Sequence, residues 1–163
     1  MASPENLNID KMNEMVGAFH KESDRGAAIL AGSFLEHYLG LFLRSKILDE
    51  KIADKLFDAM GPLASFSQRI AIAYAFGFID KQQHADLDLI RKIRNHFAHN
   101  PLNGTFSDNE VKTKVTALTT YGKSNGYKAD HGRQVYILAC AVLCTKFELA
   151  MRRVAQQKNE KDK

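Results

Sequence analysis

The stretch Arg91-Lys-Ile-Arg-Asn-His-Phe-Ala-His99 contains three cationic side chains, an asparagine and two imidazoles within nine residues. Ile93 and Phe97 lie four residues apart in it, the spacing of side chains that share one face of a helix. A helix that buries this face must also satisfy many hydrogen-bonding groups close to a core. The stretch therefore predicts a core-contacting helix with a polar cluster, and such a cluster is a candidate functional site.

Helical spacing divides the polar side chains of this segment between two faces. Arg91, Asn95 and His99 follow one another at intervals of four residues and share one face. Arg94 lies on the apolar face, together with Leu87, Ile90 and Phe97. Because a guanidinium on an apolar face needs acceptors, we expect Arg94 to pair with a carboxylate. The available carboxylates are those of Asp24, Glu36, Asp86 and Asp88.

The apolar spacing is helical along almost the whole chain, and no run of β-branched residues alternates with polar ones. We expect helices over residues 8–20, 23–47, 50–60, 65–76, 81–99, 107–120 and 133–156, with a loop at 121–132. The prediction is an all-α fold, a single-domain bundle of six or seven helices. The domain covers residues 1–155, and residues 156–163 are expected to form a disordered polar tail.

Capping residues mark several of these boundaries. Ser23 is a candidate N-cap, with Asp24 in the first turn, where a negative charge is favoured by the helix dipole. Ser65 with Gln68 and Ser107 with Glu110 have the spacing of capping boxes. Gly61-Pro62 and Asn100-Pro101 are expected to end helices.

Composition is that of a soluble protein, with 45% hydrophobic and 26% charged residues among 163. The longest apolar run, Val135 to Cys144, is ten residues and about half the length of a membrane span. The N-terminus has no secretory signal pattern, so we expect a cytoplasmic protein without membrane contact. Cys140 and Cys144 are interpreted as reduced core residues, and neither a metal nor a cofactor is expected.

The net charge of +4 is unevenly distributed. Residues 1–111 contain 12 basic and 15 acidic side chains, whereas residues 112–163 contain 11 basic and 4 acidic ones. A basic C-terminal third could attract a polyanion such as nucleic acid. The alternative is a solvated surface followed by a charged tail.

The run Arg94-Asn95-His96-Phe97-Ala98-His99 resembles the motif of the HEPN superfamily, an Arg followed by a polar residue and then a His, on a helix of a small bundle. In active members that motif resembles a metal-independent ribonuclease site, commonly completed across a dimer interface. The resemblance implies that Arg94 stabilises phosphorane-like charge, Asn95 positions the phosphate and His99 transfers protons. Many relatives with this motif are binding modules rather than enzymes.

Three longer blocks are more specific: Ser23-Asp-Arg-Gly-Ala-Ala-Ile-Leu30 with Phe34-Leu-Glu36, Gly61-Pro-Leu-Ala-Ser-Phe-Ser-Gln-Arg-Ile70 with Ala73-Tyr-Ala-Phe-Gly77, and Asp86-Leu-Asp-Leu-Ile-Arg-Lys-Ile-Arg-Asn-His-Phe-Ala-His99. In this order, over roughly residues 20–150, they resemble the mannitol operon repressor family of bacterial regulators. The resemblance implies an all-helical, cytoplasmic, self-associating negative regulator of mannitol uptake and metabolism genes. It also implies that no standard DNA-binding motif is present, so repression need not involve direct operator contact.

The polar residues of these blocks come from three expected helices, and we expect them to meet in one network. The set comprises Asp24, Arg25, Arg69, Arg91, Arg94, Asn95 and His99. In this network Asp24 would accept a hydrogen bond from Arg94 or Arg91. The alternative is that Asp24 only caps its helix, while Arg25 and Arg69 lie over apolar neighbours or hold a loop.

Direct DNA reading has a possible location in the sequence. The helices expected at 65–76 and 81–99 have helix-turn-helix spacing, which would place Lys81, Gln82, Gln83 and His84 at the start of a recognition helix. An ordinary helical hairpin has the same pattern and is preferred.

The leading hypothesis is a transcriptional regulator of the mannitol-repressor type. It is not an enzyme, acts through a regulatory protein partner or non-standard DNA contact, and is a possible homodimer. The alternative is a HEPN-type metal-independent endoribonuclease, or an inactive RNA-binding module, that uses Arg94, Asn95 and His99. A third interpretation, a pure protein-interaction module, depends on Tyr121 and Tyr127 in the expected loop.

Overall fold

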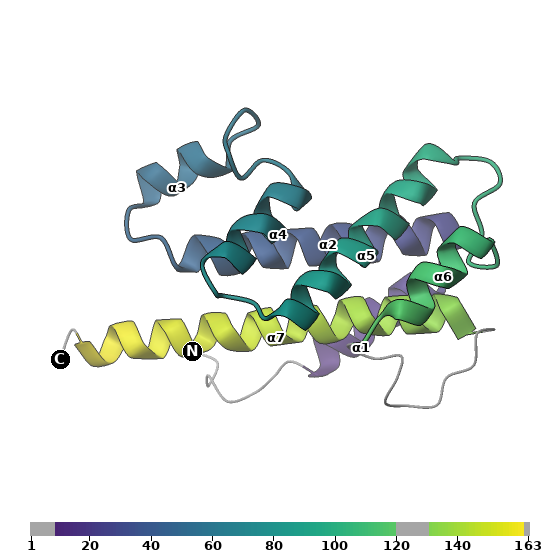
Figure 1. The fold of residues 1–163 in the computed structure, drawn as a ribbon. Coiled ribbons are helices and arrows are strands. Elements are labelled where there is room, and N and C mark those ends of the chain that lie inside the picture. The colour runs from purple at the N-terminus through teal and green to yellow at the C-terminus, as the bar shows by residue number, and fades with distance from the viewer. Residues whose placement is uncertain (1–8, 120–130, 162–163) are drawn as a thin grey trace.

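The computed structural model describes residues 9–119 and 131–161, which form seven helices (Figure 1). These are α1 (Ile9–His20), α2 (Asp24–Ser45), α3 (Glu50–Phe57), α4 (Phe66–Ala75), α5 (Lys81–His99), α6 (Asn109–Ala117) and α7 (Gly132–Lys161). No strand occurs in this described part of the chain. The prediction of an all-α bundle of six or seven helices is confirmed.

The two longest helices, α2 and α7, run side by side in the same direction (Figure 1). Their contacts advance together along both sequences: Asp24 with Arg133, Ala28 with Tyr136, and Phe42 with Phe147. α5 packs on α2 in the opposite direction, since Arg94 contacts Glu36 and Arg25 contacts Phe97. α2 also touches α1 and α4, so it is the central helix of the bundle.

Small residues on α2 allow its neighbours to come close. Ala27, Ala28, Ala31 and Gly32 are all buried. A Cβ on Gly32 would lie 2.8 Å from the Tyr136 hydroxyl and 3.1 Å from the Cβ of Arg94. Two turns later, a Cβ on Gly40 would lie 3.0 Å from the guanidinium of Arg69. The glycines therefore provide the space in which α7 and two arginine side chains lie against α2.

The first half of α7 forms the centre of the hydrophobic core, as its almost entirely apolar sequence predicts. Tyr136 is fully buried there, and its hydroxyl donates a hydrogen bond of 2.8 Å to the Ala28 carbonyl. Cys140 and Cys144 are free thiols, both buried. Burial raises the pKa of Cys144 to about 12, so it is a protonated packing residue. The interpretation of the two cysteines as reduced core residues is confirmed.

Several predicted helix boundaries are confirmed. Ser23 caps α2 by accepting a hydrogen bond from the Gly26 amide, and Ser65 with Gln68 forms the predicted capping box of α4. Gly77, which follows α4, has a φ of 68°, a left-handed conformation that glycine adopts easily. A further capping box at Asp80, outside the set predicted from spacing, begins α5.

The capping box predicted at Ser107 and Glu110 is wrong. α6 begins after Asp108, and no side chain caps it. The Asp108 carboxylate instead accepts hydrogen bonds from the amide and the hydroxyl of Thr105, at 3.1 and 3.0 Å. These bonds hold the carboxylate against the preceding loop, so it is not directed at the amides of the helix.

Other helix ends also differ from the prediction, since α2 ends at Ser45 rather than Ile47 and α6 ends at Ala117 rather than Thr120. α3 ends at Phe57 rather than Met60, because Asp58 leaves the helical conformation and its carboxylate accepts from the Ala59 amide. α7 continues to Lys161, so the segment expected to be a disordered tail from residue 156 is helical up to that point. The boundary between domain and tail stays a prediction. The loop expected at 121–132 lies almost wholly outside the described residues, as do Tyr121 and Tyr127.

α2 and α7 are long and apolar enough to span a membrane by length and composition alone. Half of each apolar window is buried inside the bundle, and the core helix of a soluble protein passes the same test. These helices are therefore weak evidence for a membrane span. Cytoplasmic location stays a prediction.

The close approach at Gly32 can be tested by a substitution. We expect Gly32→Ala to lower the free energy of unfolding by about 1–3 kcal/mol, because its Cβ would push on Tyr136 and Arg94. Gly17→Ala in α1 is the matched control. A Cβ there meets nothing within 4 Å, so we expect a gain of about 0.5–1 kcal/mol from helix propensity. Denaturant unfolding measures both, and equal effects would contradict the packing described.

Candidate functional site

Arg94 is paired with Glu36 of α2, with 3.1 Å between Nη1 and Oε2. Both side chains are about four-fifths buried, at 23% and 19% exposure. The guanidinium carbon also lies 5.5 Å from the centre of the Phe66 ring, and Nε is buried without a hydrogen-bond partner. The prediction that Arg94 points inward to a carboxylate is confirmed, and the carboxylate is that of Glu36.

Arg69 reaches the same part of α2 from α4. Its guanidinium donates to the carbonyls of Leu63 and Glu36, at 2.8 and 3.2 Å, and more weakly to Ala64. It also lies 5.2 Å from the centre of the Phe57 ring. Arg69 and Arg94 therefore meet at Glu36, where the three helices α2, α4 and α5 are held together.

Arg91 and Asn95 lie outside this cluster. Arg91 pairs with Asp88 on its own helix at 2.6 Å, and Lys92 pairs with the same carboxylate at 2.8 Å. Partial burial raises the pKa of Asp88, but hydrogen bonds from Lys92 and Arg91 outweigh it and hold the pKa below its ordinary value. Asn95 is half-buried, and its side chain makes no hydrogen bond to any described residue.

The two histidines of the motif have different surroundings. His96 lies between the carboxylates of Asp108 and Glu110, at 3.2 and 3.4 Å. The pKa of Asp108 is held below its ordinary value, first by its bonds to Thr105 and then by His96. His99 is exposed at the end of α5. Arg94 is turned inward to Glu36 whereas His99 is exposed, so the two side chains have different surroundings, and the HEPN resemblance stays a sequence prediction.

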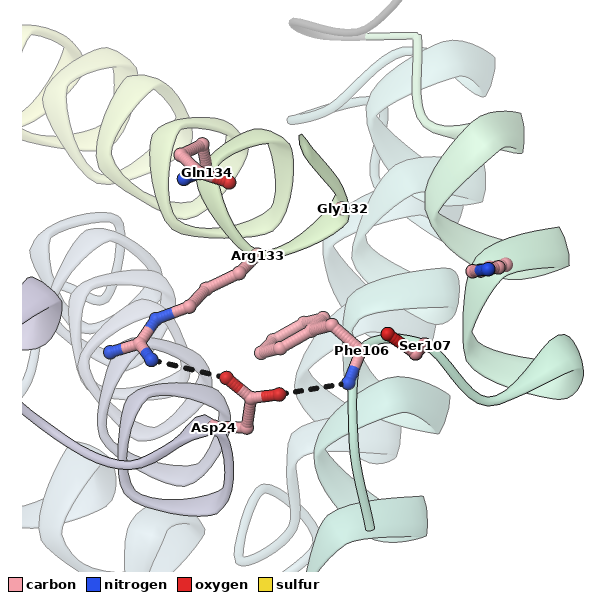
Figure 2. Close-up of a pocket in the computed structure, with 7 residues that line it drawn as sticks. Asp24, Phe106, Ser107, Gly132, Arg133 and Gln134 are labelled. Atoms are coloured by element: carbon pink, nitrogen blue, oxygen red, sulfur yellow. Dashed lines mark hydrogen bonds and ion pairs between the residues drawn. The ribbon is translucent and has the colours of Figure 1, made fainter. Parts of the chain in front are cut away.

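Asp24 does not pair with Arg94 or Arg91, so that part of the predicted network is wrong. Its two carboxylate oxygens accept from Arg133 of α7 and from the Phe106 amide, each at 3.1 Å (Figure 2). The reason is topological: α7 runs parallel to α2, which places the first turn of α7 beside the first turn of α2. Arg25, the neighbour of Asp24, reaches the Phe97 carbonyl of α5 at 3.2 Å.

Arg133 joins three segments of the chain. Besides Asp24, it donates to the carbonyls of Phe19 and His20 in the last turn of α1, at 3.1 and 3.2 Å, and to that of Glu22. A cation in this position satisfies carbonyls that have no partner within the helix. Arg133 therefore fixes the end of α1 and the start of α2 to α7.

A polar pocket of about 320 Å³ lies beside the Asp24–Arg133 pair, where the first turns of α2 and α7 face α6 (Figure 2). It is lined by Asp24, Phe106, Ser107, Lys112, Gly132, Arg133 and Gln134. A second, mainly apolar groove of about 550 Å³ lies between α1 and α2. Within the described ranges, no group of three or more metal-ligating side chains is present.

The predicted site residues thus do not form one network: four of them lie at three separate places, and Arg91, Asn95 and His99 lie at none of these. Arg69 and Arg94 share Glu36, Arg25 reaches the end of α5, and Asp24 belongs to the pocket at α7. Sequence reasoning did not identify Arg133, Lys112 or His96 as members of any site. Arg133 follows a glycine at the expected start of the last helix, but its partners are more than 100 residues away in the chain, and local pattern cannot reveal them.

The chain is similar to mannitol repressors over most of its length. The family model described as MtlR, mannitol repressor, matches residues 34–147. The mannitol operon repressor of Escherichia coli (strain K12) is 27% identical over 73 residues, which are 45% of this chain and 37% of the relative. The mannitol operon repressor of E. coli O6:H1 (strain CFT073) matches to the same extent. The matched segment thus spans little more than a third of these curated relatives.

Two solved structures share the fold. A chain of the X-ray structure of the MtlR–HPr complex from Escherichia coli aligns with a TM-score of 0.62 at 19% identity, covering 86% of this chain and 98% of that one. A possible transcriptional regulator, YggD from Shigella flexneri 2a, aligns with a TM-score of 0.62 at 17% identity, covering 90% and 99%. At these identities the likeness establishes the fold alone.

The Arg94–Glu36 pair is expected to stabilise the bundle. Arg94→Leu would leave a mostly buried carboxylate without its cation, so we expect a loss of about 1–3 kcal/mol in the free energy of unfolding. Arg91→Leu is the control on the same helix. Asp88 would keep Lys92 as a partner, so the expected loss is below about 0.5 kcal/mol. Equal midpoint temperatures of thermal unfolding for wild type and Arg94→Leu would refute the stabilising role of the Arg94–Glu36 pair.

Proposed function

This chain belongs to the mannitol repressor family, and we propose that it represses mannitol uptake and metabolism genes by binding a protein partner instead of reading an operator directly. The family match over residues 34–147 is the observation that carries the regulatory role. One solved neighbour is a complex of MtlR with the protein HPr. An HPr protein of the same organism is therefore the first partner to test. Homodimer formation stays a prediction.

The start of α5 supports a partner protein over direct base reading. A recognition helix needs free side chains at its first turns to reach base edges. Gln83 accepts from the Asp80 amide in the capping box, and the His84 ring lies 4.4 Å from that of Tyr74. Two of the four side chains that would contact bases are therefore engaged inside the protein.

The apolar groove between α1 and α2 is the surface that best fits a partner. Leu30 and Phe34 line it and are 39% and 43% exposed, and Phe34 rests edge-on against Phe19 at 5.5 Å. Exposed apolar surface of this kind marks interaction sites in soluble proteins. Glu14 of α1 and Glu22, which lies between α1 and α2, line the same groove and are exposed.

This chemistry fits an amphipathic helix of the partner with apolar anchors and flanking Lys or Arg side chains. The partner helix would lie in the groove between α1 and α2. Its apolar anchor residues, spaced one helical turn apart, would contact the apolar side chains of both helices. The acidic side chains would attract the basic flanks and set the orientation of the bound helix. The proposal is therefore that HPr, or another regulatory protein, docks a basic amphipathic helix between α1 and α2.

Calorimetric titration with HPr from the same organism tests this proposal. We expect Phe34→Ser to weaken binding by about tenfold or more, because an aromatic anchor in the centre of an interface contributes most of its energy. Phe76→Ser, which changes an exposed phenylalanine at the end of α4, should leave binding unchanged. Thermal unfolding of both variants checks that the fold is kept. Full binding by Phe34→Ser would exclude the groove, and no binding by wild type would exclude this partner.

Operator binding is tested separately by fluorescence anisotropy. Labelled mannitol control-region DNA is titrated with the chain at several salt concentrations, with random DNA and RNA as competitors. We expect any binding to fall steeply with salt and to be removed equally by both competitors, as for a basic surface without base recognition. Selective retention of the control region would show that the chain reads its operator directly.

A further inference from the structure

We propose that the polar pocket between α2, α6 and α7 binds a small organic anion, a phosphate monoester or a carboxylate, through Lys112 and Ser107 beside the Asp24–Arg133 pair. Its volume of about 320 Å³ lies at the small end of the range for ligand pockets, roughly 300–1,000 Å³. The pocket is lined mainly by polar and charged residues (Figure 2). The inference is independent of the proposed function, because it concerns binding by the isolated chain.

The carboxylate in the pocket is already satisfied. One oxygen of Asp24 accepts from Arg133 and the other from the Phe106 amide, both at 3.1 Å. Asp24 therefore neutralises one of the two cationic side chains that line the pocket. Lys112 supplies a second positive charge, and among the described residues no further carboxylate lines the pocket. The lining thus has a net charge of about +1 and more donors than free acceptors.

Lys112 is the side chain that a ligand would satisfy. It is half-buried, and it forms no ion pair with any residue that the structure describes. Lys114 lies two positions later on the same helix and is held by Glu110 at 2.6 Å. An anion in the pocket would give this ammonium a charge-assisted hydrogen bond that no described carboxylate supplies.

One further donor lines the same space, because the hydroxyl of Ser107 forms no hydrogen bond with a described residue. The pocket also includes the first turn of α7, where the helix dipole favours a negative charge. These donors suit an oxygen-rich anion and offer little to a cation or an apolar ligand.

Binding is measured by titrating the ¹⁵N-labelled chain at constant ionic strength with inorganic phosphate, glycerol 3-phosphate and acetate. Glycerol serves as the neutral control. With at least one anion, we expect saturable changes in NMR chemical shift that are confined to the amides of Ser107, Lys112, Gly132 and Gln134. With glycerol, we expect no such changes. Whichever of the phosphates or acetate binds more tightly identifies the anionic group.

The matched variants are Lys112→Gln and Lys114→Gln, which remove the same charge from one helix. We expect Lys112→Gln to weaken anion binding by about tenfold or more, because a charge-assisted hydrogen bond is lost, whereas Lys114→Gln retains wild-type affinity. Ser107→Ala, an exposed substitution, gives a second test with an expected loss of a few fold. Absence of saturable shifts, or equal weakening by both lysine variants, would overturn the proposal.

Discussion

The close contact between α2 and α7 is the constraint on which the rest of the structure depends. It requires small residues on α2, because Gly32 lies where any side chain would meet the Tyr136 hydroxyl and Arg94. It also requires a parallel arrangement, since the buried Tyr136 hydroxyl bonds to Ala28 near the start of α2. This arrangement places Arg133 beside the end of α1 and beside Asp24. The contact between α2 and α7 therefore determines where the pocket and the end of α1 lie. The position of α1 in turn defines the apolar groove.

The polar cluster that is conspicuous in the sequence is mainly a means of holding helices together. Arg94 and Arg69 lie against glycines of α2 and converge on Glu36, which links α2 to α4 and α5. Asp86, fully buried, accepts hydrogen bonds from the amide and hydroxyl of Thr119 and so fixes the chain after α6. Since these side chains bind one another and the backbone, the groove and the pocket are the better candidates for function in the described part of the chain.

The fold could be predicted from sequence because helices depend on local spacing and capping, as at Ser23 and Ser65. The inward position of Arg94 could also be predicted, because it follows from the helical repeat. Its partner could not, because the choice between Glu36 and Asp24 depends on how α5 crosses α2. The partners of Asp24 could not be predicted for the same reason, because they depend on how α7 packs against α2. The error at Ser107 has a different cause: Asp108 bonds to Thr105, and spacing cannot show which local acceptor a donor will select.

We propose that this chain represses through a protein surface and not through the Arg94–His99 motif. The most direct measurement is expression of a reporter gene under the mannitol control region, in the source organism with the gene for this chain deleted. The deletion is complemented with wild type, His99→Ala or Phe34→Ser at equal protein levels. We expect wild type and His99→Ala to restore repression and Phe34→Ser to leave the reporter expressed. Loss of repression with His99→Ala, together with full repression by Phe34→Ser, would contradict it.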